Sequence, residues 1–260
     1  MEGLADKLVE ELEVETVFTI PIGDGIPVAE SVVVTWIIIA FLLIFCFIMT
    51  RNLKVRNISK RQAIIETIVV KLENLTGSMV GERGRGLTPY LTTILMYITL
   101  ANIIGIFGFK SPTKDLNVTI ALALMSIVLV QAAGIRYLGF KGWLKRFTQP
   151  VGMVTPFNIL DLVTRPLSLC MRLFGNVLGA FVIMKLLELA MPAPVIVPAV
   201  FSIYFDLFDG ILQAYVFVFL TSLYIKEEIE EEEEEGRKKK RRHKKNVPKL
   251  KDNEIQQKIA

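Results

Sequence analysis

The sequence predicts an all-α integral membrane protein with five membrane passes, additional helices at the membrane surface and a steeply tilted helical hairpin near its C-terminal end. Two observations lead to this prediction. The chain of 260 residues is 52% hydrophobic and has a mean hydropathy of +0.49, which is too apolar for a soluble domain of this length. Its apolar residues are also gathered into five blocks, each long enough to supply the about 20 residues that a spanning helix needs.

The N-terminal part of the chain contains the first predicted span. Residues 1–30 are acidic and lack a basic start followed by an apolar core, so we expect an exterior segment rather than a signal peptide. The uncharged stretch 31–50 is the first membrane helix. The basic segment 51–86 follows, and within it residues 61–80 mix charged and apolar side chains at near-helical spacing. This pattern predicts an amphipathic helix lying on the inner membrane surface.

Two further spans are predicted in the middle of the chain. Residues 87–109 and 117–135 form apolar blocks, and the short segment 110–116 joins them as an outer loop. The basic segment 136–155 then reads as a second cytoplasmic loop. The pattern so far predicts three helices that cross the membrane in alternating directions.

The distribution of lysine and arginine predicts the orientation of the chain. The segments after the first and third spans are basic, whereas the N-terminal segment has one lysine among many acids. Positively charged loops stay on the cytoplasmic side. We therefore expect the N-terminus outside and the C-terminus inside, which agrees with an odd number of passes.

The fourth predicted membrane helix, residues 156–191, carries polar residues along one face. Arg172 is the most informative of them, because arginine stays charged and its place in hydrocarbon costs at least ~2.5 kcal/mol. Pro166 is expected to bend this helix or to mark its start within the membrane. The polar positions recur every three or four residues and so share a helix face: Asn158, Asp161, Arg165, Ser168, Arg172, Asn176 and Gly179.

The fifth predicted helix, residues 192–226, carries a matching stripe of Asp206, Asp209 and Gln213. Two carboxylates within a span are costly unless they meet water, a proton or a partner. The prolines of MPAPV, residues 191–195, favour a hairpin between the fourth and fifth blocks. The apolar run that follows would form about 46 Å of helix, longer than the ~30 Å hydrocarbon core, so the helix must tilt or bend.

The C-terminal tail, residues 227–260, has low complexity. An acidic run is followed by the basic run RKKKRRHKK, residues 237–245. One interpretation is a solvated cytoplasmic extension that is partly helical or disordered. The other is a docking strip for the stalk of a partner or for anionic lipid.

Several functions are not supported by the sequence. It has no GxxxxGK[ST] phosphate loop, no evident catalytic triad and no metal-ligand cluster, so we expect no catalysis by the chain alone, no cofactor and no metal site. Five spans also argue against a nucleic-acid partner. Two other classes stay open: a secondary transporter that binds an anion at Arg172, and a membrane anchor for a soluble partner. No inverted repeat supports the transporter, and an anchor needs no arginine within the membrane.

The fourth and fifth blocks closely resemble subunit a of the F-type ATP synthase, bacterial type. The resemblance rests on RPLSLCMRLFGN, residues 165–176, and on LQAYVFVFLTSLY, residues 212–224. The segments PFNILD, residues 156–161, and PTKDLNVT, residues 112–119, are also similar to the family. The likeness extends over about residues 31–225 in the same order.

This resemblance implies an ion-translocating stator subunit in the plasma membrane of a bacterium. Its expected partners are the rotor ring of c subunits, the b subunit of the peripheral stalk and membrane lipid. The tilted hairpin would face the rotor ring. Two offset half-channels would pass protons or sodium ions to and from the ring carboxylates, which couples ion flow to rotation and ATP synthesis. The sequence does not decide between the two ions, because the rotor ligands lie on another chain.

The resemblance also implies roles for single residues. Arg172 corresponds to the stator arginine of the family, Asn176 to a polar support near it and Gln213 to the glutamine opposite it. Asp206 stands where relatives carry a histidine or an acid that lines the outer half-channel. Asp209 is an additional acid one turn further on.

The sequence departs from the family pattern at Phe181, where several relatives have a glutamate or histidine. We expect Asp206 and Asp209 to take over this role in the outer half-channel. The inner half-channel candidates are Asn158, Asp161, Thr164 and Ser168. Asp161 and its neighbour four residues on can instead be a plain ion pair, and the other three can be ordinary hydrogen-bonding groups between helices.

Overall fold

The computed structural model describes residues 16–21, 26–51, 53–54, 58–146, 155–190 and 200–246. The start of the acidic N-terminal segment, the turn of the predicted hairpin and the end of the tail lie outside the described residues. Five helices of the described chain are long and apolar enough to cross a membrane, as the sequence predicts: Glu30–Thr50, Arg83–Phe107, Leu116–Tyr137, Thr155–Met184 and Val200–Ile229.

A short β-hairpin precedes the first span and is absent from the all-α prediction. Strand β1 (Thr16–Ile20) pairs antiparallel with β2 (Ile26–Ala29), and helix α2 (Glu30–Thr50) follows directly. Ser31 Oγ at the start of α2 donates a hydrogen bond of 2.5 Å to Asp115 Oδ2. This bond ties α2 to the segment that precedes α5.

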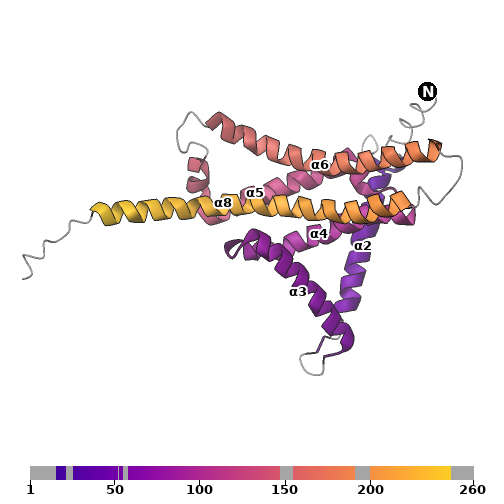
Figure 1. Ribbon diagram of the computed structural model, residues 1–260, viewed down its shortest axis with the longest axis horizontal. Helices are drawn as coiled ribbons and strands as arrows, with labels where there is room; N and C mark the ends of the chain where they lie inside the picture. Colours follow the sequence, from indigo (N-terminus) through magenta and orange to yellow (C-terminus); the bar gives the residue numbers. More distant parts are fainter. Residues whose placement is uncertain are drawn as a thin grey trace, which may run out of the picture.

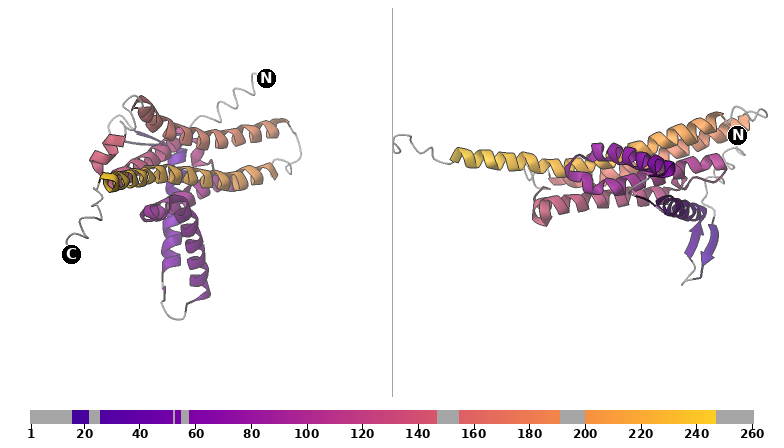
Figure 2. Two further views of the ribbon diagram at one scale, coloured as in Figure 1. Left: turned by 60° about the vertical axis from the view of Figure 1, so that its left-hand side comes forward. Right: turned by 90° about the horizontal axis from the view of Figure 1, so that it is seen from below.

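Helix α3 (Lys60–Val80) is one residue longer than the predicted amphipathic helix. It begins at an N-cap serine and ends at Gly81, whose φ of 82° suits glycine. The short helix η1 (Arg83–Leu87) leads into α4 (Thr88–Ile103) and η2 (Ile104–Phe107). Helices α2 and α3 converge toward the connection between them and project to one side of the long helices α6 and α8 (Figures 1 and 2).

Helix α5 (Leu116–Arg146) follows the short helix η3 (Pro112–Lys114) and extends well beyond the predicted span. The first part of the predicted cytoplasmic segment 136–155 is therefore helical, although the apolar span itself ends at Tyr137. The helix changes direction at Gly139, whose φ of 71° is not helical. Beyond this kink, Trp143 Nε1 donates to Gln131 Oε1 at 2.7 Å and holds the extension against the preceding turns.

Helix α6 (Thr155–Ala190) is continuous through Pro166, so the proline does not mark a helix start within the membrane. The fifth span begins in a helical turn at Val200, passes through the π-helical segment η5 (Ile203–Asp209) and continues as α8 (Gly210–Asn246). Helix α8 runs on past the end of the span at Ile229 into the charged run, so no loop separates the two. Figure 1 shows this end of α8 extending beyond the other helices.

The main hydrophobic core lies where α4, α5, the middle of α6 and α8 meet. Leu91, Ile98, Leu173 and Phe217 are among its fully buried side chains. A smaller cluster packs α2 against α4. Many other apolar side chains of the long helices are exposed, as expected for helices whose remaining neighbours are lipid tails or other subunits.

Candidate ion-conducting site

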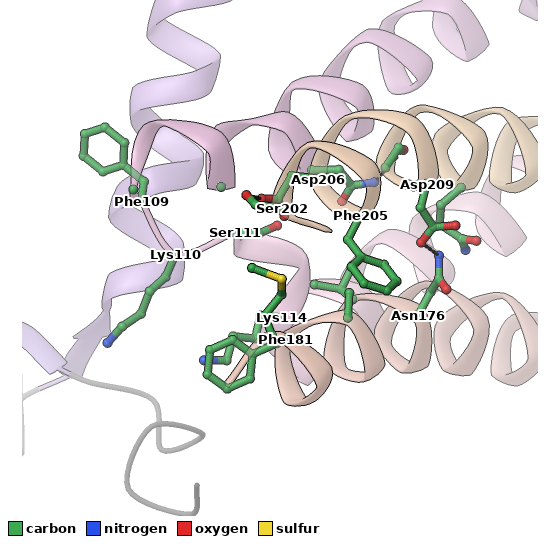
Figure 3. A pocket seen from close by; sticks show the side chains of 18 residues that line it. Phe109, Lys110, Ser111, Lys114, Asn176, Phe181, Ser202, Phe205, Asp206 and Asp209 are labelled. Atoms are coloured by element: carbon green, nitrogen blue, oxygen red, sulfur yellow. Dashed lines mark hydrogen bonds between the residues drawn. The ribbon is translucent and has the colours of Figure 1, made fainter. Parts of the chain in front are cut away.

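A cavity of about 330 Å³ brings together the polar residues that the sequence singled out on two different helices. Asn176 enters it from α6, and Asp206 and Asp209 enter it from η5 (Figure 3). Gln213 of α8 also lines it. Other walls come from the end of α4 and from the segment before α5. Arg172 is not among the lining residues.

The two acids point toward opposite walls of the cavity (Figure 3). Asp209 Oδ2 accepts a hydrogen bond of 2.6 Å from Asn176 Nδ2 on α6. Asp206 Oδ2 accepts a bond of 2.7 Å from Ser202, on the same helical segment. The carboxylate of Asp206 lies against Gly105, because a Cβ placed on that glycine would stand 3.1 Å from Asp206 Oδ1.

The π-helical segment gives this part of the chain its geometry. Its wider i→i+5 turn shifts the angular relation between Asp206 and Asp209, compared with a regular helix. The segment ends at Gly210, which is packed so tightly against α4 that a Cβ there would lie 2.8 Å from the Cβ of Asn102. Asn102 Nδ2 also donates to the Gly210 carbonyl at 2.9 Å. Glycine is therefore the residue that permits this approach of α8 to α4.

A buried hydrogen-bond chain behind the cavity was missed by reasoning from the sequence. Thr113 Oγ1 donates to Asn102 Oδ1 at 2.7 Å, and the hydroxyls of Thr113 and Ser111 lie 2.7 Å apart. Ser111 in turn donates to the Ala101 carbonyl at 2.7 Å. In the sequence, the one sign of these hydrogen bonds was Asn102, which carries an amide within an otherwise apolar block. These hydrogen bonds anchor the segment before α5 to α4 and to the end of η5.

Phe181 is a lining residue of the same cavity, and a lysine faces it. Lys114 Nζ lies 3.2 Å from the centroid of the Phe181 ring, which is a cation–π contact. The cavity is thus lined by two acids and two lysines, and one of these lysines contacts the position where the sequence departs from the family pattern. Figure 3 shows Lys114 and Phe181 together at one side of the cavity.

Gln213 is buried, with an exposed fraction of 5%. Its Nε2 has no hydrogen-bond partner within the part of the chain that the structure describes. A buried amide donor without a partner costs about 1–3 kcal/mol. The Nε2 donor of Gln213 is therefore a group that a water molecule or an acceptor on another subunit would satisfy.

Arg172 lies on the exposed face of α6, beside the exposed apolar side chain of Met171. Leu169 and Leu173, on the adjacent face of the helix, are buried. No hydrogen bond or ion pair joins Arg172 to another residue of the described ranges. An arginine on an apolar surface within a span requires a partner, and this surface leaves the place for one open.

The four inner candidates on α6 lie toward its start and do not line this cavity. Asp161 Oδ2 is 3.9 Å from Arg165, and Glu227 on α8 is closer to the same guanidinium at 3.3 Å. This favours the alternative of an ion pair for Asp161. Thr164 donates weakly to a backbone carbonyl at 3.4 Å. Ser168 is exposed on α6, and Asn158 is half-buried.

The family model described as ATP synthase A chain matches residues 32–226, which is most of the chain and contains Arg172 and every residue that lines the cavity. The chain belongs to the ATP synthase A chain family. It is therefore an ion-conducting component of the membrane sector of an ATP synthase. This membership decides against the secondary transporter and against the simple membrane anchor.

Relatives named ATP synthase subunit a align over most of the chain. A protein of Propionigenium modestum named "ATP synthase subunit a, sodium ion specific" is 35% identical over 221 residues, covering 79% of this chain and 75% of that protein. Subunit a of Moorella thermoacetica is 35% identical over 201 residues, covering 77% of this chain and 90% of that protein. Subunit a of Legionella pneumophila strain Philadelphia 1 is 30% identical over 218 residues, covering 82% of this chain and 91% of that protein.

Proposed function

We propose that this subunit a forms two offset half-channels that deliver ions to, and collect them from, carboxylates on a rotor ring of c subunits. The catalytic steps of ATP synthesis belong to other subunits, and a b subunit of the peripheral stalk holds the chain in place. The N-terminus lies outside and the C-terminus lies in the cytoplasm of a bacterial cell.

The observation that carries this proposal is the position of Arg172. It projects from an exposed face of α6 and has no anionic partner among the described residues. Along the same helix, Asn176 already reaches the acid-lined cavity. Gly175 is open as well, because a Cβ placed there would meet nothing within 4 Å. This face suits a neighbouring helix that carries a carboxylate to the arginine.

The charge of Arg172 acts in two ways. It attracts a rotor carboxylate that has lost its ion, with about 4 kcal/mol for unit charges ~4 Å apart at an effective dielectric near 20. It also repels a cation that would pass directly from one half-channel to the other. The membrane potential adds ~2.3 kcal/mol per charge for each ~100 mV and thus biases the direction of ion transfer.

The acid-lined cavity serves as the outer half-channel. Asp206 and Asp209 provide negative charge, and a side-chain donor orients each of them. Each carboxylate therefore keeps its other oxygen for a proton, a cation or a water molecule. Gln213 also lines the cavity and supplies an amide donor without a partner among the described residues. The acids compensate for Phe181, which has no polar group to offer.

The inner half-channel runs along the start of α6, past Ser168, Thr164, Asp161 and Asn158. These side chains precede Arg172 in the helix and share its polar face. Of these, Asp161 is the weakest candidate, because it is also the ion-pair partner of Arg165. The two half-channels then reach the rotor face on opposite sides of Arg172.

The test replaces Arg172 in the assembled complex, reconstituted in sealed vesicles. Arg172→Ala abolishes ion-driven ATP synthesis and lets ions pass without rotation, so the vesicles show passive flux that an inhibitor of the rotor carboxylate blocks. Arg172→Lys keeps the positive charge but loses the planar, forked guanidinium group. It therefore still resists ion leakage but couples ion flow poorly to ATP synthesis. Arg136→Ala, at an exposed site on α5, is the matched control and leaves both activities unchanged.

Normal synthesis by Arg172→Ala would overturn the proposal. Absent synthesis in vesicles that stay tight would remove the leak-barrier role and leave only the ion-release role. Running the assay with a proton gradient and with a sodium gradient identifies the transported ion, which for the P. modestum relative is sodium according to its name.

A further inference from the structure

A second cavity, of about 440 Å³, lies at the junction of α2 and α3, in a different part of the molecule from the ion path. Three basic side chains line it: Arg51 at the end of α2, Lys54 in the connection and Arg61 in the first turn of α3. All three residues are exposed. Among the described residues, none of the three forms an ion pair with an acid.

Lys54 is tied to the start of α3 by hydrogen bonds. The buried side chain of Gln62 accepts from Lys54 N and donates to Lys54 O, both at 3.0 Å. Its Nε2 also donates to Glu66 at 2.7 Å, and its backbone N–H donates to the capping oxygen of Ser59 at 3.3 Å. The cations are therefore arranged around a preformed site, and the positive end of the α3 dipole adds to their field.

The surroundings of the cations are apolar. Ile48, Leu53 and Ile65 line the same cavity. Next to it, α2 exposes Phe47 at 69% and α3 exposes Ile64 at 61%. A free phosphate or a sugar phosphate has no apolar part to pack on such a surface. A phospholipid, by contrast, presents a charged headgroup beside apolar acyl chains. The left view of Figure 2 shows α2 and α3 projecting together to one side of the long helices.

We propose that this cavity binds the phosphate headgroup of an anionic phospholipid, with its acyl chains along α2 and α3. The guanidinium groups of Arg51 and Arg61 suit the oxygens of a phosphodiester, and Lys54 adds a point charge. Basic pockets between membrane helices bind lipid headgroups in this way. The bound lipid would fasten the α2–α3 pair to one leaflet and so keep the stator in position. This inference does not depend on the proposed path of the ions.

The test uses the assembled complex in vesicles that contain a phosphatidylglycerol probe with a photoreactive acyl chain. Cross-linked peptides are mapped by mass spectrometry. The probe is expected to label peptides from α2 and α3 much more than a matched phosphatidylcholine probe does. Millimolar inorganic phosphate is expected to leave this labelling unchanged. Equal labelling by both probes, or protection by inorganic phosphate, would overturn the proposal, and these comparisons need no variant.

A charge-removal variant gives a second measure. Changing Arg51, Lys54 and Arg61 to glutamine should lower the affinity for the anionic probe by roughly a hundredfold, as expected for three basic groups at an anionic surface. The matched control removes the same charge elsewhere, at Lys71, Arg136 and Lys141, and keeps the labelling. Unchanged labelling in the first variant, with assembly intact, would refute the site.

Discussion

The hydrogen bond between Asn176 and Asp209 should be essential for the conduction of ions. We predict that Asn176→Leu slows ion-driven ATP synthesis by about tenfold while the complex still assembles. Leucine has a similar size and removes only the amide. The carboxylate of Asp209 then loses the donor that now lies 2.6 Å from its Oδ2 and directs it into the cavity.

The magnitude follows from the geometry of this bond. Hydrogen bonds between membrane helices contribute ~0.6 kcal/mol on average and ~1.7 kcal/mol at most, while bonds to charged groups contribute about 1.5–3 kcal/mol. For a short bond to a half-buried carboxylate we take the value where these ranges meet, ~1.5 kcal/mol. This corresponds to about a tenfold change in the population of correctly oriented Asp209. Asn176→Asp is more severe, because two carboxylates at this spacing repel by about 6 kcal/mol at an effective dielectric near 20.

The assay is a double-mutant cycle on the complex in sealed vesicles. Ion-driven ATP synthesis and ATP-driven pumping are measured for Asn176→Leu, for Asp209→Leu and for both together. Because the two side chains act through one bond, the double variant should be little worse than Asp209→Leu alone. Asn117→Leu makes the same substitution at an exposed position outside the cavity and should have no effect.

Additive losses in the cycle would refute this reasoning, since they would mean that the two side chains act separately. A normal rate for Asn176→Leu would show that the bond does not orient a group on the ion path. Loss of assembled complex in that variant alone would assign the bond to the packing of α6 against α8 instead.

Three further predictions follow from the same geometry. Gly210→Ala places a methyl group 2.8 Å from the Cβ of Asn102, so it should destabilise the subunit by about 1–3 kcal/mol. The expected readout is a lower melting temperature of the complex, and an unchanged melting temperature would contradict the tight α4–α8 contact. The double change Asp206→Asn and Asp209→Leu should slow ion entry without loss of assembly, and normal ATP-driven pumping would exclude these acids as the main inlet. A reporter fused to the C-terminal residue should be active only in the cytoplasm, and activity only at the exterior would reverse the proposed orientation.

Five apolar blocks and two polar stripes could be recognised from the sequence alone. The length of a span and its apolar composition are local properties, because a helix in a membrane satisfies its backbone hydrogen bonds within itself. The span Glu30–Thr50 therefore falls within one residue of the predicted 31–50. The spacing of Asn176, Asp206, Asp209 and Gln213 likewise placed each of them on a polar face before any contact was known.

Contacts between helices were decided only by the tertiary structure. Periodicity did not reveal that η5 is a π-helix, nor that Asp209 turns to Asn176 while Asp206 lies beside Gly105. It also did not show that residues 136–146 are helical and that Trp143 holds them against the preceding turns.

The role of Asn102 was hidden for the same reason. Within an apolar block its amide carries no periodic signal, and it acquires a function only when Gly210 lets α8 approach closely enough to accept its hydrogen bond. Hydropathy thus determined which segments cross the membrane. The rotation of each helix and the partner of each polar group depend on packing between segments far apart in the chain, which composition and spacing do not encode.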